Sequence, residues 1–203
     1  MAKAKITLID LGYGNNKSII NALKYIEIDT VVTNKVKNIL NSDMLILPGV
    51  GAFNTGVEYL EKFNLIDTIK ETTLIKKRKI LGICLGMQLM GKSSEEAKNK
   101  NGLNFFDIKF KKFSEKISVP HMGFNESFSK NFSLTQNIQS CFFYFAHSFK
   151  ALINKRKKYK TLTCNHGGNF IAGIEKDNFF GVQFHPEKSQ NNGLKVLKNF
   201  YKL

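Results

Sequence analysis

The chain has 203 residues and 42% hydrophobic side chains, which suits one globular domain that buries its own core. No apolar run approaches the roughly 20 residues that a membrane helix needs, and the start lacks a signal-peptide pattern, so we expect a cytoplasmic protein. The net charge of +15 would suit a nucleic-acid binder. However, only Arg78 and Arg156 among the 31 basic residues are arginine, the side chain that grips phosphates and bases bidentately. We therefore expect lysine-rich solvated loops and no nucleic-acid partner, with a basic face toward an acidic protein as the remaining alternative.

Short apolar runs alternate with segments of helical periodicity through about the first 100 residues. Strands are predicted at 6–9, 29–32, 44–47 and 79–83, and helices at 18–26, after Asn54 and from Met87 onward. This alternation predicts an α/β fold with a central, mostly parallel sheet flanked by helices.

From about residue 105 the pattern changes to short segments rich in aromatic and β-branched residues. Strands are predicted there at 105–113, 142–145, 159–164, 170–174 and 179–184, followed by a helix at 191–201. Gly167-Gly168 and Asp177-Asn178 are typical turn pairs between such strands. We therefore predict antiparallel strands in the C-terminal half and a single domain over residues 1–203.

Cys84 is the clearest candidate for a reactive side chain. It lies in Gly82-Ile83-Cys84-Leu85-Gly86, between a predicted strand and a predicted helix. A nucleophile at such a tight turn needs small residues two positions before and after it, because the backbone folds back on itself. The following helix N-terminus favours a thiolate. The alternative is a buried structural cysteine beside incidental glycines.

His185 is the candidate base for this nucleophile. It follows an apolar strand and precedes Pro186 and Glu187. Extended residues two apart point the same way, so Glu187 is placed to hold the imidazole in the tautomer that accepts a thiol proton. The alternative is a surface histidine beside a solvated glutamate.

A third element is the loop Leu47-Pro48-Gly49-Val50-Gly51-Ala52-Phe53, which follows a predicted strand. Its glycines allow the loop to aim a backbone N–H at a developing oxyanion. By itself the pattern also fits an ordinary turn between a strand and a helix.

Taken together, these stretches resemble the class I, triad-type glutamine amidotransferases, which have a flavodoxin-like fold. Within that family the chain is most similar to the glutaminase subunits of imidazole glycerol phosphate synthase, from histidine biosynthesis. The resemblance covers most of the chain and rests on seven ordered motifs: Gly12-Tyr13-Gly14-Asn15, 47–53, 82–88, Ser93-Ser94-Glu95-Glu96, 119–125, 143–149 and 181–189.

The resemblance implies a role for each matched residue. It assigns the catalytic triad to Cys84, His185 and Glu187. The family's oxyanion hole falls on Gly49, Val50, Gly51 and Leu85, and its glutamine-holding positions on Gln88, Glu96, His147, Ser148 and Phe149. No metal or cofactor is implied.

The resemblance also implies a partner. Glutamine would be hydrolysed through a glutamyl thioester, and the ammonia would pass to a (β/α)₈ barrel cyclase without entering bulk water. The positions that face this partner in the heterodimer match Asn15, Met122, Phe124, Asn125 and Lys188. In the family the glutaminase is nearly idle until the partner is loaded.

Two aromatic positions depart from the family pattern. Phe124 replaces the usual tryptophan and Phe149 the usual tyrosine, and each loses a polar tip. Gly102-Leu103-Asn104 also replaces a commoner Gly-Leu-Gly. These departures keep open a related pathway, in which the ammonia aminates or amidinates a nucleotide-linked or surface sugar. A binding or regulatory module without turnover is a third hypothesis, against which the intact triad argues.

Overall fold

A computed structural model describes residues 4–14, 16–129, 131–152 and 159–203. Five parallel strands form one half of its sheet in the order β2-β1-β3-β4-β12, with β2 at the edge. Their bounds are β1 Ile6–Ile9, β2 Thr30–Thr33, β3 Met44–Leu47, β4 Lys79–Ile83 and β12 Phe179–Val182. The burial of β1, β3, β4 and β12 follows from their nearly continuous apolar sequences.

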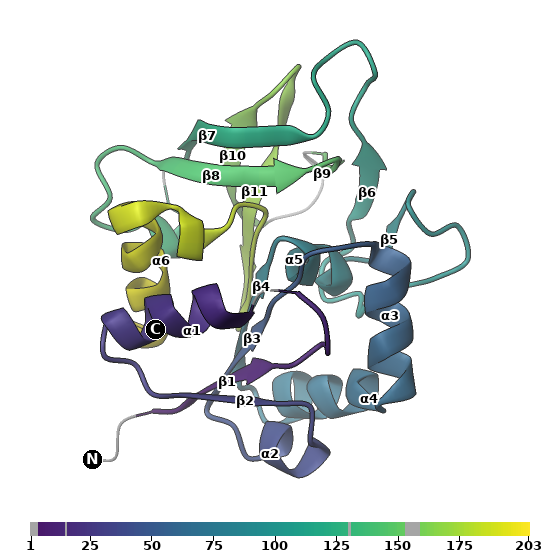
Figure 1. Cartoon of the computed structure of the whole chain (residues 1–203), viewed down its shortest axis with the longest axis vertical. Coiled ribbons are helices and arrows are strands. Elements are labelled where there is room, and N and C mark those ends of the chain that lie inside the picture. Colours follow the sequence, from purple (N-terminus) through teal and green to yellow (C-terminus); the bar gives the residue numbers. More distant parts are fainter. Residues whose placement is uncertain (1–3, 15, 130, 153–158) are drawn as a thin grey trace.

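Antiparallel strands continue the sheet beyond β12 in the order β11-β10-β7-β8. Their bounds are β7 His121–Phe128, β8 Phe142–His147, β10 Lys160–Asn165 and β11 Asn169–Lys176. Short strands β5 Ser93–Ser94, β6 Lys109–Lys112 and β9 Phe149–Ala151 attach beside β11. The predicted change from parallel to antiparallel pairing is therefore confirmed (Figure 1).

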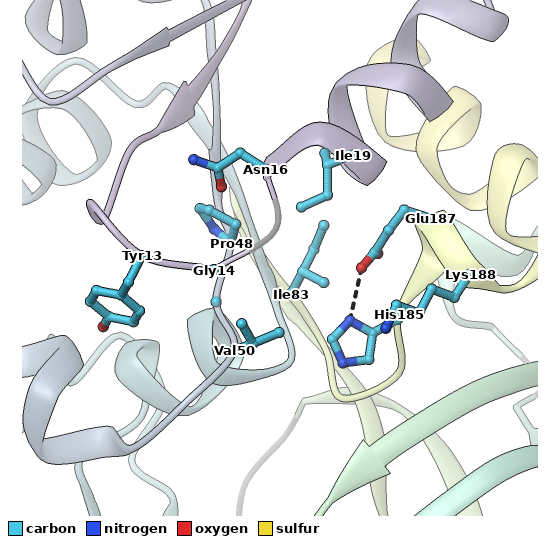
Figure 2. Close-up of a pocket in the computed structure, with 11 residues that line it drawn as sticks. Tyr13, Gly14, Asn16, Ile19, Pro48, Val50, Ile83, His185, Glu187 and Lys188 are labelled. Atoms are coloured by element: carbon cyan, nitrogen blue, oxygen red, sulfur yellow. Dashed lines mark hydrogen bonds and ion pairs between the residues drawn. The ribbon is translucent and has the colours of Figure 1, made fainter.

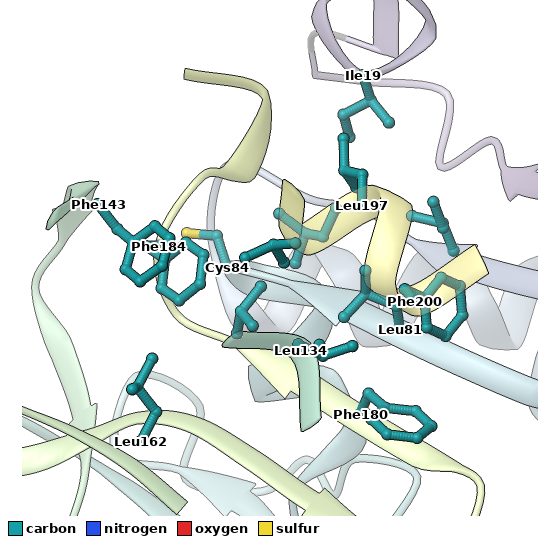
Figure 3. Close-up of a cluster of buried hydrophobic side chains, with 14 of the residues drawn as sticks. Ile19, Leu81, Cys84, Leu134, Phe143, Leu162, Phe180, Phe184, Leu197 and Phe200 are labelled. Atoms are coloured by element: carbon teal, nitrogen blue, oxygen red, sulfur yellow. The ribbon is translucent and has the colours of Figure 1, made fainter. Parts of the chain in front are cut away.

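Helices cover both faces of the sheet (Figure 1). On one side α1 Asn16–Tyr25 and α6 Gln190–Lys202 pack over the sheet. The other side carries α2 Val36–Leu40, α3 Phe53–Lys62, α4 Leu65–Lys70 and α5 Leu85–Met90, and α4 continues into a π-helical turn at Glu71–Ile75. Each layer of helices closes over its own cluster of buried apolar side chains, and Cys84 belongs to the cluster beneath α1 and α6 (Figure 3).

Some predicted elements have different bounds in the structure. The strands at 6–9, 44–47 and 79–83 are confirmed residue for residue. The strand predicted at 105–113 is wrong over most of its length, because only Lys109–Lys112 pairs. Phe105 and Phe106 instead lie in an irregular segment, and their buried side chains pack against the ring of Phe179.

Candidate active site

Cys84 occupies the sharp turn between β4 and α5, as the sequence predicted. Its backbone has φ 52° and ψ −107°, a strained conformation for a residue with a side chain. A Cβ added at Gly86 would lie 1.8 Å from the Leu47 carbonyl oxygen, and one at Gly82 would lie 2.7 Å from the Met87 nitrogen. The two glycines are thus required by close backbone approach.

His185 and Glu187 lie beside this turn. The Nδ1 atom of His185 is 2.8 Å from Oε1 of Glu187, and both side chains are buried. Burial alone would lower the pKa of His185, but its interactions with the nearby Cys84 sulfur and with Glu187 outweigh burial and raise the pKa from 6.5 to about 10. The imidazolium form is therefore favoured between the sulfur and the carboxylate.

The backbone around His185 is held by contacts that its sequence pattern did not reveal. Pro186–Lys188 form a 3-10 turn directly after His185. The hydroxyl of Ser189 donates to the His185 carbonyl at 2.6 Å and accepts from the Tyr144 N–H at 2.9 Å. Helix α6 fits against this turn because Gly193 has no Cβ, which would lie 1.8 Å from the Pro186 carbonyl oxygen.

The loop between β3 and α3 passes directly over the start of α5. The Leu85 N–H, one of the predicted oxyanion donors, donates to the carbonyl of Gly49 at 3.3 Å. Gly51 has φ +110°, which favours glycine. In this conformation the Leu85 N–H is already hydrogen-bonded to the Gly49 carbonyl.

A small space lies on the far side of the same loop (Figure 2). It measures about 30 Å³, enough for a water molecule, and Gly14 and Val50 line one side of it while His185 and Glu187 line the other. The second carboxylate oxygen of Glu187, Oε2, is buried and has no hydrogen-bond partner among the described residues. Among the described residues, the carboxylate therefore forms its hydrogen bond to His185 through one oxygen, Oε1.

A larger cavity of about 320 Å³ opens over Cys84. It brings together most of the residues singled out in the sequence: Val50, Gly51, Cys84, Leu85, Gln88, Glu96, Met122, His147, Ser148, Phe149, His185 and Lys188. These residues come from six separate stretches of the chain. The cavity is of a size that suits a small polar molecule.

The residues expected to hold glutamine are themselves fixed by hydrogen bonds. Gln88 donates from Nε2 to Oε1 of Gln183 at 3.3 Å. Glu96 accepts the N–H of Phe53 at 2.7 Å and so caps the start of α3. The carbonyl of Phe149 lies 2.8 Å from Nδ1 of His147.

His147 belongs to a buried chain of neutral rings. Because a carbonyl only accepts, Nδ1 of His147 donates to Phe149, and its Nε2 accepts from Nδ1 of His121 at 3.0 Å. Nε2 of His121 in turn accepts from the Asn125 amide at 3.2 Å. Burial lowers the pKa of His147 to about 3 and of His121 to about 4, and neighbouring imidazoles, including His166 stacked on His121, add to the effect.

The residues expected to face a partner lie on the β7–β8 hairpin and next to it. Met122 is 65% exposed and Phe124 is 49% exposed, so this hairpin presents an apolar strip beside the mouth of the cavity. Asn125 also donates to the Asn165 carbonyl, and the Lys188 ammonium lies 5.6 Å from the centre of the Tyr144 ring. Asn15 lies outside the described residues.

Comparison with known proteins identifies the family. The model of the class-I glutamine amidotransferases matches residues 7–203, so the chain belongs to this family. A solved structure titled glutamine amidotransferase superposes with a TM-score of 0.79 at 14% identity, covering 97% of each chain, which shows the shared fold.

The curated relatives are more specific. The imidazole glycerol phosphate synthase subunit HisH 2 of Methanococcus maripaludis is 42% identical over 97% of this chain and 98% of its own. Subunit HisH 1 of a Campylobacter jejuni strain is 39% identical over 98% of this chain and 100% of its own. Subunit HisH 2 of the same strain is 38% identical over 98% of each.

Among the described residues, no helix is long and apolar enough to cross a membrane. The same part of the chain contains no group of three or more His, Cys, Asp or Glu side chains placed to hold a metal ion.

Proposed function

We propose that this chain is the glutamine-hydrolysing subunit of an imidazole glycerol phosphate synthase, working in the cytoplasm as one glutamine amidotransferase domain over residues 1–203. The observation that carries the proposal is that Cys84 and His185 line one cavity while the buried carboxylate of Glu187 lies 2.8 Å from the other side of the His185 ring. The names of the full-length relatives agree with it.

The geometry supports a thioester mechanism. The Cys84 thiolate attacks the side-chain amide carbon of glutamine, and the C–N bond breaks as the His185 imidazolium gives its proton to the leaving nitrogen. Ammonia leaves and a glutamyl thioester remains. His185, now neutral, takes a proton from the attacking water, and the C–S bond breaks to release glutamate. Glu187 holds the imidazole in place through both steps, because its Oε1 accepts from Nδ1.

The oxyanion loop gives this mechanism a switch. The tetrahedral intermediate needs backbone N–H donors. The Leu85 N–H, however, already donates to the Gly49 carbonyl. Rotating the peptide between Gly49 and Val50 would remove that carbonyl and turn the Val50 N–H toward the substrate. The glycines at 49 and 51 permit the rotation. The conformation described here therefore corresponds to a resting state with low turnover.

We further propose that a (β/α)₈ barrel cyclase binds over the cavity. The exposed Met122 and Phe124 provide the apolar centre of the docking surface. Lys188 lines the cavity next to them, and Asn125 lies on the same hairpin. Ammonia that passed directly into the partner would stay unprotonated and nucleophilic.

A second function remains a candidate because of two observations. Phe124 lacks the polar tip of the usual tryptophan at the proposed partner surface. The chain is also about equally similar to subunits numbered 1 and 2 from one bacterial strain, at 39% and 38% identity. Two such subunits in one strain allow two destinations for ammonia. The alternative is therefore a subunit that supplies ammonia to a surface-sugar pathway.

One experiment tests the chemistry and a second tests the pathway. Cys84→Ala and Cys84→Ser should abolish glutamate formation, and normal turnover by either would disprove the mechanism and favour a binding module. For the pathway, the purified chain is combined with the barrel subunit from the same genome and loaded with the histidine-pathway ribonucleotide. Glutamine-dependent cyclisation supports the synthase. No cyclisation, together with glutamine-dependent amination of a sugar-linked acceptor, supports the alternative.

A further inference from the structure

Gln183 is a completely buried polar residue beside the nucleophile. It directly follows β12, whose Val182 pairs in parallel register with Ile83, so Gln183 and Cys84 are neighbours across the two strands. The Cys84 N–H donates to the Val182 carbonyl at 2.8 Å, and the Gln183 N–H donates to the Ala172 carbonyl at 2.8 Å. These backbone bonds fix the place from which the Gln183 side chain extends.

Both ends of the Gln183 amide are engaged. Its Oε1 accepts from Nε2 of Gln88 at 3.3 Å, and its Nε2 donates to the Cys84 sulfur at 3.6 Å. Because Gln88 uses the oxygen, the amide group is left with its N–H atoms directed at the sulfur. Burying such an amide is costly unless its polar atoms are paired, and here the pairing includes the reacting atom.

We propose that Gln183 is a catalytic residue that stabilises the negative charge on the Cys84 sulfur. The inference rests on the proposed function, since it assigns a second donor, beside His185, to the same nucleophile. The sulfur carries charge before it attacks glutamine and again when the C–S bond of the thioester breaks. Gln183 keeps its proton in both steps, so it acts by hydrogen bonding and not as an acid or base.

The same contacts tie the nucleophile to the glutamine-holding residues. Gln88 follows Cys84 by one helical turn, and its N–H donates to the Cys84 carbonyl at 3.2 Å. Its side chain then fixes the orientation of the Gln183 amide. A substitution at Gln88 would therefore weaken substrate binding and would also disturb the hydrogen bond from Gln183 to the sulfur.

The test measures thiolate formation directly. Alkylation of Cys84 by iodoacetamide is followed against pH in a Cys141→Ser background, because Cys141 is partly exposed while Cys164 is buried, and the modified residue is located by mass spectrometry. Other charged or titratable groups around the cavity over the sulfur are His147 on β8, Glu96 after β5, and His185 and Lys188 around the 3-10 turn, with Glu187 hydrogen-bonded to His185. All of them stay in place in every variant.

Gln183→Leu removes the hydrogen-bond donor and keeps a similar volume. Gln183→Glu keeps the shape but replaces the N–H donor with a negatively charged acceptor beside the sulfur. A hydrogen bond to a charged group predicts that kcat falls about 10- to 100-fold in Gln183→Leu. The midpoint of alkylation should rise by about one pH unit or more, and further in Gln183→Glu. The matched control Gln139→Leu, the same change at an exposed position, should leave both quantities unchanged.

An unchanged or lowered midpoint in Gln183→Leu would overturn the inference, since the amide would then present its oxygen to the sulfur or not act on it. If Gln183→Leu does not fold, Gln183→Glu and Gln183→Met decide in the same way. Failure of the proposed function is separate, because it is detected by glutaminase activity in Cys84→Ala. An inactive Cys84→Ala together with an unchanged midpoint in the Gln183 variants would reject only the role of Gln183.

Discussion

Gly86→Ala is the substitution whose effect follows most directly from the structure. The new Cβ would lie 1.8 Å from the Leu47 carbonyl oxygen, and carbon atoms of this kind need at least about 3.0 Å, so the two must separate by about 1.2 Å. The Leu47 carbonyl belongs to β3, which is buried on both faces and paired with β1 and β4. Helix α5 is the element that has to move.

Movement of α5 changes catalysis as well as stability. Cys84 and the Leu85 N–H stand at the start of this helix, and a displacement of about 1 Å at reacting groups lowers rates by about 100-fold. Overpacking in a filled core costs about 1–3 kcal/mol. At about 2–4 °C per kcal/mol for a chain of this length, Tm should fall by several degrees.

The assay is glutamate formation by the subunit in complex with its loaded barrel partner, together with thermal unfolding of the subunit alone. Gly168→Ala is the control, because a Cβ there meets nothing within 4 Å, while its φ of +122° still strains the backbone. It should lose stability and keep kcat/KM. A Gly86→Ala variant with the kcat/KM of the parent would refute the argument that α5 must shift the nucleophile.

Three further predictions follow from the hydrogen bonds around the site. Glu187→Gln removes the charge that supports the His185 imidazolium, so kcat should fall on the order of 100-fold, measured against pH, and an unchanged pH profile would contradict the assignment. Ser189→Ala leaves the Tyr144 N–H without its acceptor and should lower the free energy of unfolding by about 1–3 kcal/mol in urea; no change would contradict the bracing role. Stability should fall as pH drops from about 6.5 toward 4, because the unfolded chain protonates His121 and His147 at their ordinary pKa of 6.5 while the folded chain holds the pKa of His121 at about 4 and that of His147 at about 3. His121→Phe should flatten that part of the stability curve, and an equally steep curve would show that other groups cause the loss.

The central sheet was predictable because its strands are short, apolar and buried on both faces. Short, almost entirely apolar sequences of this kind favour strands in the interior of a sheet, as at Ile6–Ile9, Met44–Leu47 and Lys79–Ile83. Strand β7 was not predicted, since His121 points into the protein while Met122 and Phe124 face outward, which inverts the usual order of polar and apolar side chains. The outward apolar residues are the ones that we propose contact a partner subunit.

The candidate site was predictable where chemistry forces a spacing. The glycines around Cys84 are such a spacing. His185 and Glu187 do meet, but the predicted reason was wrong, because Pro186–Lys188 form a 3-10 turn and not extended backbone. Gln183 and Gly193 carry no comparable signal, because one polar residue after a strand or one glycine in a helix has many explanations. Their roles depend on distances between segments that lie far apart in the sequence.

The position of β12 has a consequence for how the protein is made. This strand fills the place between β4 and β11, so the sheet stays open in the middle until residues 179–182 have been synthesised. Cys84 is present about 100 residues before the side chains of Gln183 and His185 exist. A nascent or truncated chain would therefore hold Cys84 without the histidine that we propose as its base. We expect such a chain not to hydrolyse glutamine before the last strand has closed the sheet.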